Sequence, residues 1–262
     1  MQRIQDCNVL KNVPVAKDTY LMWLDVGAGK EKLYWPGRFV HLQVPGRPDL
    51  ILRRPISIHG YHNAQGRLEL VYQLKGAGTH AFAACKPGDV LSVLGPLGNG
   101  FSVPEGAREC VLLGGGIGCA PLKLLPQQET EVAFDAILGF RSSEWIYQRE
   151  EFERVCRHVQ WMTDDGSFGE QGFVTSALQR RLESGARTDA IFVCGPAPMY
   201  RSLYAVMERF PHVPCYVSLE ERMGCGMGAC MTCTCEILRQ GEVSRQRVCL
   251  DGPVFDWKEI VR

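Results

Sequence analysis

The fold is decided by the stretch Val111-Leu112-Leu113-Gly114-Gly115-Gly116-Ile117-Gly118-Cys119-Ala120-Pro121. Its first residues are apolar, as in a buried strand, and its glycines form a loop that leads into the start of a helix. Glycines keep side chains away, so backbone amides there can face a pyrophosphate. The loop does not match the strict G-x-G-x-x-G fingerprint, but its context is that of a nucleotide-binding unit. We therefore expect NAD(H) contacts at Gly114, Gly115, Gly116 and Gly118.

Strands and helices alternate in the chain around and beyond this loop. Strands are expected at 109–113, 134–139, 158–163, 190–194 and 214–219, and apolar residues keep a helical face at 174–182 and 203–210. This alternation predicts an α/β domain at residues 104–219 with a parallel sheet and crossover helices. Pro126 interrupts the first expected helix, which must therefore be short.

A second loop, Cys194-Gly195-Pro196, follows the strand expected at 190–194. It should lie at the carboxyl edge of the sheet, where α/β folds bind ligands, and we expect it to contact NAD(H). Asp164 and Asp165 end another strand, where a carboxylate binds a ribose hydroxyl and repels a 2′-phosphate. Arg141 points the other way, because arginine can receive that phosphate. On balance the sequence favours NADH over NADPH.

The chain before residue 104 has a different pattern of apolar and turn-forming residues. Short apolar runs such as 20–24, 39–44 and 68–72 are separated by Gly, Pro and Asn clusters every ten or so residues. This pattern is typical of an antiparallel barrel or sandwich, and we expect a small β-barrel domain at residues 1–103. One short helix is expected near 79–84.

Three features of this first region suit a flavin. Arg54-Pro55-Ile56-Ser57 stands at the end of a strand-like run, and its arginine can clamp a pyrophosphate while its serine hydroxyl donates to a flavin ring nitrogen. Gly76-Ala77-Gly78-Thr79 precedes the short helix, and the backbone amides at the N-terminus of a helix can bind a phosphate. Gly95-Pro96-Leu97-Gly98-Asn99-Gly100-Phe101 can turn tightly beside a planar ring. Taken singly, the first is also explained by an exposed strand edge with a proline bulge, and the last by an ordinary tight turn.

The twelve cysteines are distributed unevenly. Cys225, Cys230 and Cys233 have the spacing C-x4-C-x2-C and Cys249 follows, which is the plant-type [2Fe–2S] ligand arrangement. A tetrahedral zinc site is the alternative for four thiolates. Cys235, two residues beyond Cys233, is not expected to be a ligand. Seven single cysteines are expected to be small buried hydrophobes: Cys7, Cys85, Cys110, Cys119, Cys156, Cys194 and Cys215.

The composition narrows the range of partners. Lys+Arg and Asp+Glu are both 29, so the formal net charge is zero and nucleic acid is not an expected partner. The sequence offers no long apolar run and no signal-peptide pattern at Met1 onward, so we expect no membrane association and a cytoplasmic location. Residues 220–262 are too few for a core of their own and should need an inorganic group.

These motifs together resemble the ferredoxin-reductase-like flavoproteins along essentially the whole chain. The order is Arg-Pro-x-Ser, Gly-Thr, Gly-Gly-Gly-Ile-Gly-x-Ala-Pro and Cys-Gly-Pro, and the stretches 220–230 and 247–255 look like the electron-transfer subunits of class 1B dihydroorotate dehydrogenase. The resemblance implies an FAD barrel, an NAD domain and a C-terminal [2Fe–2S] domain. It implies FAD contacts at Arg54, Pro55, Ile56, Ser57, Val71, Tyr72, Gln73, Gly78 and Thr79, and cluster ligands at Cys225, Cys230, Cys233 and Cys249.

The resemblance also implies a role and a partner. In that family, electrons pass from NADH through FAD and the cluster to the FMN of a separate catalytic subunit of pyrimidine biosynthesis, in a complex of two copies of each. The chain alone is then not expected to act on dihydroorotate. The small subunit of an NAD(P)H–ferredoxin oxidoreductase or hydrogenase-type complex is an alternative with the same layout. A zinc-stabilised nucleotide-sensing or interaction protein is a further alternative, without enzymatic activity.

Overall fold

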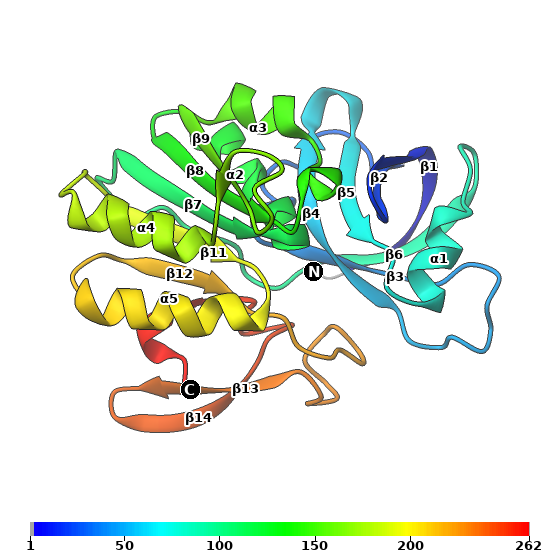
Figure 1. Ribbon diagram of the computed structural model, residues 1–262. Helices are drawn as coiled ribbons and strands as arrows, with labels where there is room; N and C mark the ends of the chain where they lie inside the picture. Colours follow the sequence, from blue (N-terminus) through cyan, green and yellow to red (C-terminus); the bar gives the residue numbers. More distant parts are fainter. Residues whose placement is uncertain (1–2, 262) are drawn as a thin grey trace.

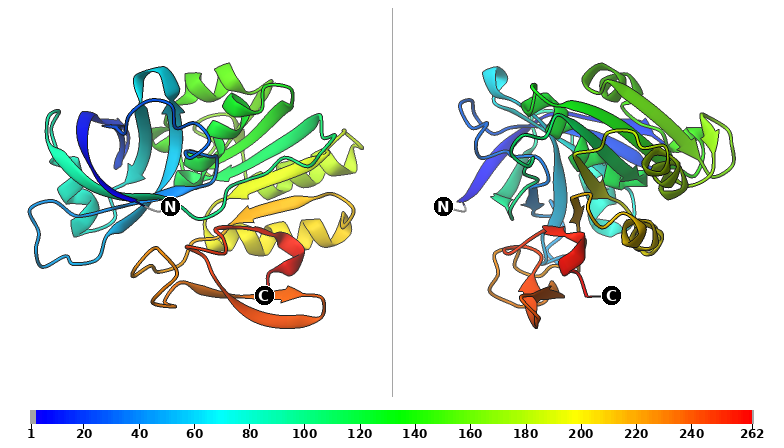
Figure 2. Two further views of the ribbon diagram at one scale, coloured as in Figure 1. Left: turned by 180° about the vertical axis from the view of Figure 1, so that it is seen from behind. Right: turned by 90° about the vertical axis from the view of Figure 1, so that its left-hand side faces the viewer.

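The computed structural model describes residues 3–261, so residues 1, 2 and 262 of the predicted domains lie outside the described chain. Figure 1 shows a barrel made by the N-terminal third, a sheet with helices in front of it, and a small C-terminal segment below both. Figure 2 shows the same arrangement from behind and from the side, with the C-terminal segment beneath the other two parts.

The barrel consists of six antiparallel strands in the closed order β1-β2-β5-β4-β3-β6. Their bounds are β1 (Arg3–Ala16), β2 (Thr19–Asp25), β3 (Phe39–Leu42), β4 (Arg54–His62), β5 (Arg67–Gln73) and β6 (Val90–Leu97). Leu24, Leu42, Ile58 and Leu70 are among the side chains that fill it, each on a strand that alternates between the inside and the outside. The predicted barrel is confirmed.

Two short helices connect consecutive strands of the barrel. They are the 3₁₀ helix η1 (Asn63–Gln65) and the α-helix α1 (Ala77–Ala83), which corresponds to the short helix expected near 79–84. One local expectation was wrong. Arg54 begins β4 instead of ending a strand, because Pro55 pairs with His41 of β3 and the chain before Arg54 is a loop. Proline tolerates this position since its ring favours extended backbone and it has no N–H to pair.

The second part is a seven-stranded sheet in the order β10-β9-β8-β7-β11-β12-β15. All neighbours are parallel except β12 and β15. The strands are β7 (Glu109–Gly115), β8 (Ala133–Phe140), β9 (His158–Thr163), β10 (Glu170–Gln171), β11 (Ala190–Cys194), β12 (Cys215–Ser218) and β15 (Val254–Asp256). The chain runs from β7 to β8 and β9, then returns to β11 on the other side of β7. The order therefore reverses between β7 and β11, and α/β sheets bind ligands at such a point.

Helices cover the two faces of this sheet. Alternate residues of β7 and β11, such as Val111 and Val193, pack with Leu178 and Leu203 of α4 (Val174–Glu183) and α5 (Ala197–Arg209). The other face packs against 3₁₀ helix η2 (Gly116–Leu122), α2 (Leu124–Gln128) and α3 (Arg149–Val155), with η3 (Ser143–Trp145) nearby. The first helix is as short as predicted: α2 has five residues and contains Pro126.

The C-terminal segment joins the other two parts. Its hairpin is β13 (Thr234–Arg239) and β14 (Glu242–Arg247), and its last strand, β15, pairs antiparallel with β12 before the 3₁₀ helix η4 (Trp257–Glu259). Cys233, Val248 and Phe255 share a small core with Phe39 and Leu97 of the barrel. The segment is therefore anchored to the barrel by packing and to the sheet by a strand. Across residues 3–261, no helix is long and apolar enough to cross a membrane.

Candidate cofactor-binding site

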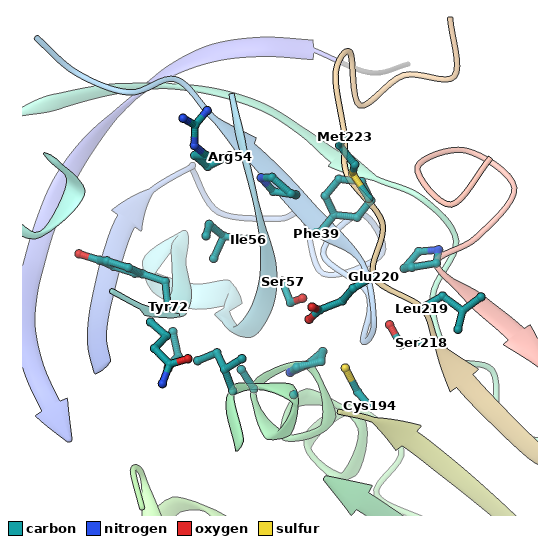
Figure 3. Close-up of a pocket in the computed structure, with 18 of the residues that line it drawn as sticks. Phe39, Arg54, Ile56, Ser57, Tyr72, Cys194, Ser218, Leu219, Glu220 and Met223 are labelled. Carbon is teal, nitrogen blue, oxygen red and sulfur yellow. The ribbon is translucent and has the colours of Figure 1, made fainter. Parts of the chain in front are cut away.

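A pocket lies between the barrel, the carboxyl edge of the sheet and the start of the C-terminal segment (Figure 3). Ten of the sixteen residues predicted to bind FAD or NAD(H) line it: Arg54, Pro55, Ile56, Ser57, Val71, Tyr72, Gln73, Thr79, Gly118 and Cys194. The other six are neighbours of these in the chain: Gly78, Gly114, Gly115, Gly116, Gly195 and Pro196. The fold thus brings segments that are far apart in the sequence to one space.

The barrel wall is formed by β4, β5 and the start of α1. The Arg54 side chain crosses Gly78 so closely that a Cβ there would lie 2.7 Å from its Nε, so glycine at this position leaves room for the guanidinium. Thr79 shapes the turn before α1, where its hydroxyl accepts from the Lys75 amide at 2.9 Å and donates to the Gly76 carbonyl at 3.0 Å. The pocket therefore has a guanidinium and a helix start on one side, a combination that suits a pyrophosphate.

Tyr72 presents an aromatic side chain to the same wall. Its hydroxyl donates to Asn12 Oδ1 at 2.9 Å, and its ring stacks on Tyr20 with centroids 5.8 Å apart. Burial raises the pKa of Tyr72, although the hydrogen bond with Asn12 works against it, so the hydroxyl stays protonated. A flat aromatic wall is suited to contact a planar ring system.

The glycine loop forms the floor, where β7 passes into η2. Ile117, Gly118, Ala120 and Pro121 line the pocket. The Tyr147 hydroxyl donates to the carbonyls of Gly116 and Ile117, at 3.3 and 3.2 Å. This contact uses carbonyl groups of the loop and none of its amides.

The second predicted loop is held by one hydroxyl. Tyr200 Oη accepts from the Gly195 amide at 3.1 Å and donates to the Ser218 carbonyl at 2.6 Å. It therefore joins the end of β11 to the end of β12. Cys194 is buried, and burial raises the pKa of its thiol.

The third wall was not among the predicted site residues. Ser218 ends β12 and Leu219, Glu220, Glu221 and Met223 follow it; these residues line the pocket together with Phe39 and Pro253. Lys75, Ile117, Ala120 and Pro121 are the remaining lining residues that the prediction missed. Figure 3 shows Leu219, Glu220 and Met223 on one continuous segment beside Ser57 and Phe39. The only sequence signal was the position of this segment between a strand end and the cysteine loop.

The cysteine loop begins two residues after Met223. Its thiols form two pairs: Cys225 with Cys230, and Cys233 with Cys249, each pair within side-chain hydrogen-bonding range. Among residues 3–261, no three His, Cys, Asp or Glu side chains converge on a point that could hold a single metal ion. Two thiol pairs match two irons better than one tetrahedral zinc.

Backbone amides point at these sulfurs. Cys225 Sγ accepts from the amides of Met227, Ala229 and Cys230 at 3.3–3.4 Å. Cys249 Sγ accepts from Gly228 N at 3.2 Å, and Cys233 Sγ accepts from Cys249 N at 3.4 Å. Amide donors around the thiolates are the contacts that stabilise an iron–sulfur cluster and tune its potential.

The thiols of this loop differ in environment. Cys230 is exposed, and hydrogen bonds from Thr232 and then from Cys225 lower its pKa to about 6. Burial, followed by the neighbouring Cys233, raises the pKa of Cys249 to about 12. Cys235 belongs to neither pair, and its thiol donates to the Gln246 carbonyl of β14 at 3.7 Å. All seven of the single cysteines are buried, as predicted.

The residues expected to choose between NADH and NADPH lie at the ends of β8 and β9. The Asp165 carboxylate accepts from the amide and the hydroxyl of Ser167, at 3.0 and 2.6 Å. Arg141 places its guanidinium 5.8 Å from the ring centroid of Trp145. Both lie outside the lining of this pocket.

Family profiles match three consecutive parts of the chain. Residues 6–101 match an oxidoreductase FAD-binding domain, residues 112–204 an oxidoreductase NAD-binding domain, and residues 220–261 the iron–sulfur cluster binding domain of dihydroorotate dehydrogenase B. A solved structure described as an NADH-dependent reduced ferredoxin-NADP oxidoreductase superimposes with a TM-score of 0.84 at 27% identity, over 97% of this chain and 89% of that one. The fold and the site therefore define a ferredoxin-reductase-like oxidoreductase with FAD-, NAD- and iron–sulfur-binding domains.

Relatives narrow this class to one family. The electron transfer subunit of dihydroorotate dehydrogenase B (NAD(+)) from Bacillus caldolyticus is 42% identical over 253 residues, covering 94% of each chain. The subunit of the same name from Enterococcus faecalis strain OG1RF is 41% identical over 233 residues, covering 86% of each. The chain belongs to the family of dihydroorotate dehydrogenase B electron transfer subunits.

Proposed function

We propose that this chain carries electrons from NADH to the FMN of a separate dihydroorotate dehydrogenase catalytic subunit, with FAD and a [2Fe–2S] cluster as its resident groups. One observation carries the proposal. The segment from Ser218 to Met223 lines the pocket and continues within two residues to Cys225. Phe39 belongs to the pocket lining and also to the core around Cys233 and Cys249. The pocket and the cysteine loop are therefore directly connected, through the segment 218–223 and through Phe39. Electron transfer over a short distance requires two sites that lie this close together.

The barrel residues fit FAD. Arg54, Gly78 and Thr79 would hold its pyrophosphate, since the guanidinium and the start of α1 lie side by side there. Ile56, Ser57 and Pro55 of β4 and Val71, Tyr72 and Gln73 of β5 would contact the flavin and its ribityl chain. Ser57 would donate its hydroxyl to a ring nitrogen.

The loops at the sheet edge fit NAD(H). Gly114, Gly115, Gly116 and Gly118 would present backbone to the pyrophosphate, and Cys194, Gly195 and Pro196 would border the nicotinamide. Asp164 and Asp165 would bind the adenosine ribose, which favours NADH. Arg141 opposes that preference less strongly because Trp145 already lies near its guanidinium.

The four paired thiols fit the cluster. Cys225 and Cys230 would bind one iron and Cys233 and Cys249 the other, because the thiols already lie as these pairs and accept backbone amides. Zinc fits less well for the same reason. Cys235 would not be a ligand, since its thiol is bonded to Gln246.

No residue of the chain has to act as a general acid or a general base. FAD, when bound, accepts a hydride as two electrons and releases electrons singly. The task of the chain is to hold the donor and acceptor groups, to exclude water between the barrel and the sheet, and to surround the cluster sulfurs with amide donors.

Exposed apolar side chains surround the exposed end of the cluster loop. Cys230 is exposed, and Met227, Met231 and Leu250 are 40–50% exposed around it. Exposed methionine and leucine at a redox centre suit a protein interface. We infer that the FMN subunit docks here, in a complex of two copies of each chain. The cytoplasm is the predicted compartment.

The proposal is tested on the full chain purified anaerobically. One FAD and two irons with two sulfides per chain, and bleaching of the visible spectrum by NADH, are the expected results. A colourless protein that contains zinc would overturn the proposal. NADPH in place of NADH tests the coenzyme preference in the same cuvette.

A second function is favoured by one comparison. The structure with the TM-score of 0.84 is described as an NADH-dependent reduced ferredoxin-NADP oxidoreductase. A chain with the same layout could instead serve a ferredoxin-linked or hydrogenase-type complex. Adding either ferredoxin or an FMN-containing dihydroorotate dehydrogenase subunit to the NADH-reduced protein separates the two, because only the physiological acceptor should be reduced rapidly.

A further inference from the structure

Glu69 and Lys123 form a buried ion pair between the barrel and the sheet. Glu69 lies on β5, and Lys123 immediately follows η2; Glu69 Oε2 and Lys123 Nζ are 3.0 Å apart. Glu69 is 5% exposed and Lys123 is 1% exposed. Burying a charge without a partner costs free energy. Each of these two charged side chains therefore needs the other in order to remain buried.

The surroundings of the carboxylate keep it charged. His62 Nε2 lies 3.0 Å and an Arg67 nitrogen 3.4 Å from Glu69 Oε1, both at the rim of the contact. Burial acts to raise the pKa of Glu69, but the charge of Lys123 and its hydrogen bond to the carboxylate favour the ionised form, and the pKa is lowered. On the barrel side a Cβ at Gly60 would lie 2.7 Å from Oε2, so the carboxylate fills the space that a side chain would take.

A second polar contact lies beside the ion pair. The pairing of β4 with β5 shifts register between Ile58 and Gly60, and the bulged residue, His59, points out of the barrel toward η2. His59 Nδ1 is 2.8 Å from the Ala120 carbonyl. Since a carbonyl only accepts, Nδ1 is the donor. Burial, followed by the charge of Lys123, lowers the pKa of His59 to about 3, so the ring is neutral.

The ion pair and the His59 hydrogen bond both involve residues in, or next to, segments that line the pocket. Ala120 and Pro121 belong to the lining, and Lys123 follows two residues later. On the barrel side, Glu69 precedes the lining residue Val71 by two positions. The ion pair therefore joins the barrel wall of the pocket to the sheet wall, next to residues that line the pocket on each side.

We propose that Glu69 and Lys123 are positioning residues that fix the separation of these two walls and thereby the approach of NADH to the flavin. The inference rests on the function proposed above. Hydride transfer needs reacting atoms about 3–3.5 Å apart, and a misplacement of about 1 Å can cost about 100-fold in rate. A buried ion pair between the walls adds a directional contact to the apolar packing of Val71 with Ala120 and Leu122, and is suited to that tolerance.

The test uses the full chain loaded with FAD and the cluster and carrying Glu69→Gln together with Lys123→Met. Removing both charges at once leaves neither one buried without a partner, so the variant should fold. The protein is mixed anaerobically with increasing NADH while the flavin absorbance is followed. We expect the limiting rate of flavin reduction to fall at least about tenfold, with FAD content unchanged and a smaller change in the apparent affinity for NADH.

The matched control is Lys17→Met with Glu144→Gln. This pair also joins the barrel to the α/β part, at 2.8 Å, but both side chains are at least half exposed and lie outside the pocket lining. It should leave the limiting rate unchanged. Amide hydrogen exchange of residues 116–122, measured on the same proteins without NADH, should become faster in the Glu69/Lys123 variant and stay unchanged in the control.

Two results would overturn the inference. In the first, the Glu69/Lys123 variant unfolds more readily but reduces its flavin at the parent rate, which would make the pair structural only. In the second, the control loses as much rate as the variant, so that any contact between the parts matters equally. If NADH does not bleach the parent protein, the proposed function fails, while the exchange of residues 116–122 still decides whether the pair holds the loop.

Discussion

His41 lies directly beneath Gly226: a Cβ atom added at Gly226 would be 2.5 Å from Nδ1 of the His41 ring. His41 belongs to β3 and is fully buried. Burial, the largest influence, lowers the pKa of His41 to about 4, so the ring is uncharged. The cysteine loop thus rests on the same barrel strand that supplies Phe39 to the pocket.

Gly226→Ala is expected to weaken the cluster site. The added methyl group would collide with His41, and the loop would have to lift from β3. We expect iron and sulfide per chain to fall by more than about half, with FAD content unchanged, as measured by metal and flavin analysis. The backbone strain of a non-glycine residue at positive φ, about 1–3 kcal/mol, adds to this collision.

Gly241→Ala separates these two causes. Gly241 has φ of +83°, close to the +72° of Gly226, but no atom lies within 4 Å of its added Cβ. The two variants therefore share the backbone strain and differ in the collision. Equal loss of iron in both would show that contact with His41 is not what seats the loop.

Cys230→Ser should remove the cluster, whereas Cys235→Ser should keep it. Cys230 lies in a thiol pair with Cys225, and its lowered pKa favours the thiolate that binds iron. Burial raises the pKa of Cys235 to about 11, and its thiol is bonded to the backbone of β14. Iron analysis and the electron paramagnetic resonance signal of the reduced protein check both. A cluster retained in Cys230→Ser and lost in Cys235→Ser would mean that Cys235, and not Cys230, is the cluster ligand.

Arg54→Leu should weaken FAD binding. The guanidinium lies at the pocket over Gly78, and a charge-assisted contact to phosphate contributes about 1.5–3 kcal/mol, equivalent to a factor of about 10–150 in the dissociation constant. FAD retained after gel filtration and its fluorescence on titration measure this. Arg47→Leu is the control, because Arg47 is paired with Asp49 on the surface and lies outside the pocket lining. Similar FAD loss in both variants would argue against a specific phosphate contact.

The predictable parts of this protein are those whose chemistry is local. The glycine loop before η2, the thiol spacing from Cys225 to Cys233 and the strand at 158–163 each need only their own neighbours, and all were recognisable. Glu220 was not, because its place in the pocket depends on how the chain leaves β12 and returns beneath the barrel. The same holds for His41 and Glu69, whose partners, Gly226 and Lys123, are far away in sequence. Polar residues on barrel strands ordinarily face solvent, and no local pattern marks these two as buried.

Asp135→Asn should destabilise the α/β part without touching the pocket. Asp135 is 6% exposed on β8; it accepts two bonds from Arg157, at 2.9 and 2.8 Å, and lies 2.9 Å from Arg181. Burial acts to raise the pKa of Asp135, but the two arginines outweigh it and the pKa is lowered. We expect a loss of about 1.5–3 kcal/mol in the free energy of unfolding at neutral pH, measured with urea.

The pH dependence of that loss follows from the sign of the shift. A carboxyl group with a lowered pKa in the folded state stabilises the fold above its unfolded pKa of about 3.9, and this contribution disappears as the pH falls toward the folded value. The difference between parent and Asp135→Asn should therefore be constant between about pH 5 and pH 8. Asp49→Asn, which removes a similar pair with Arg47 on the surface, should leave the free energy of unfolding unchanged. A difference that shrinks between pH 8 and pH 5 would mean that Asp135 is not held ionised by its arginines.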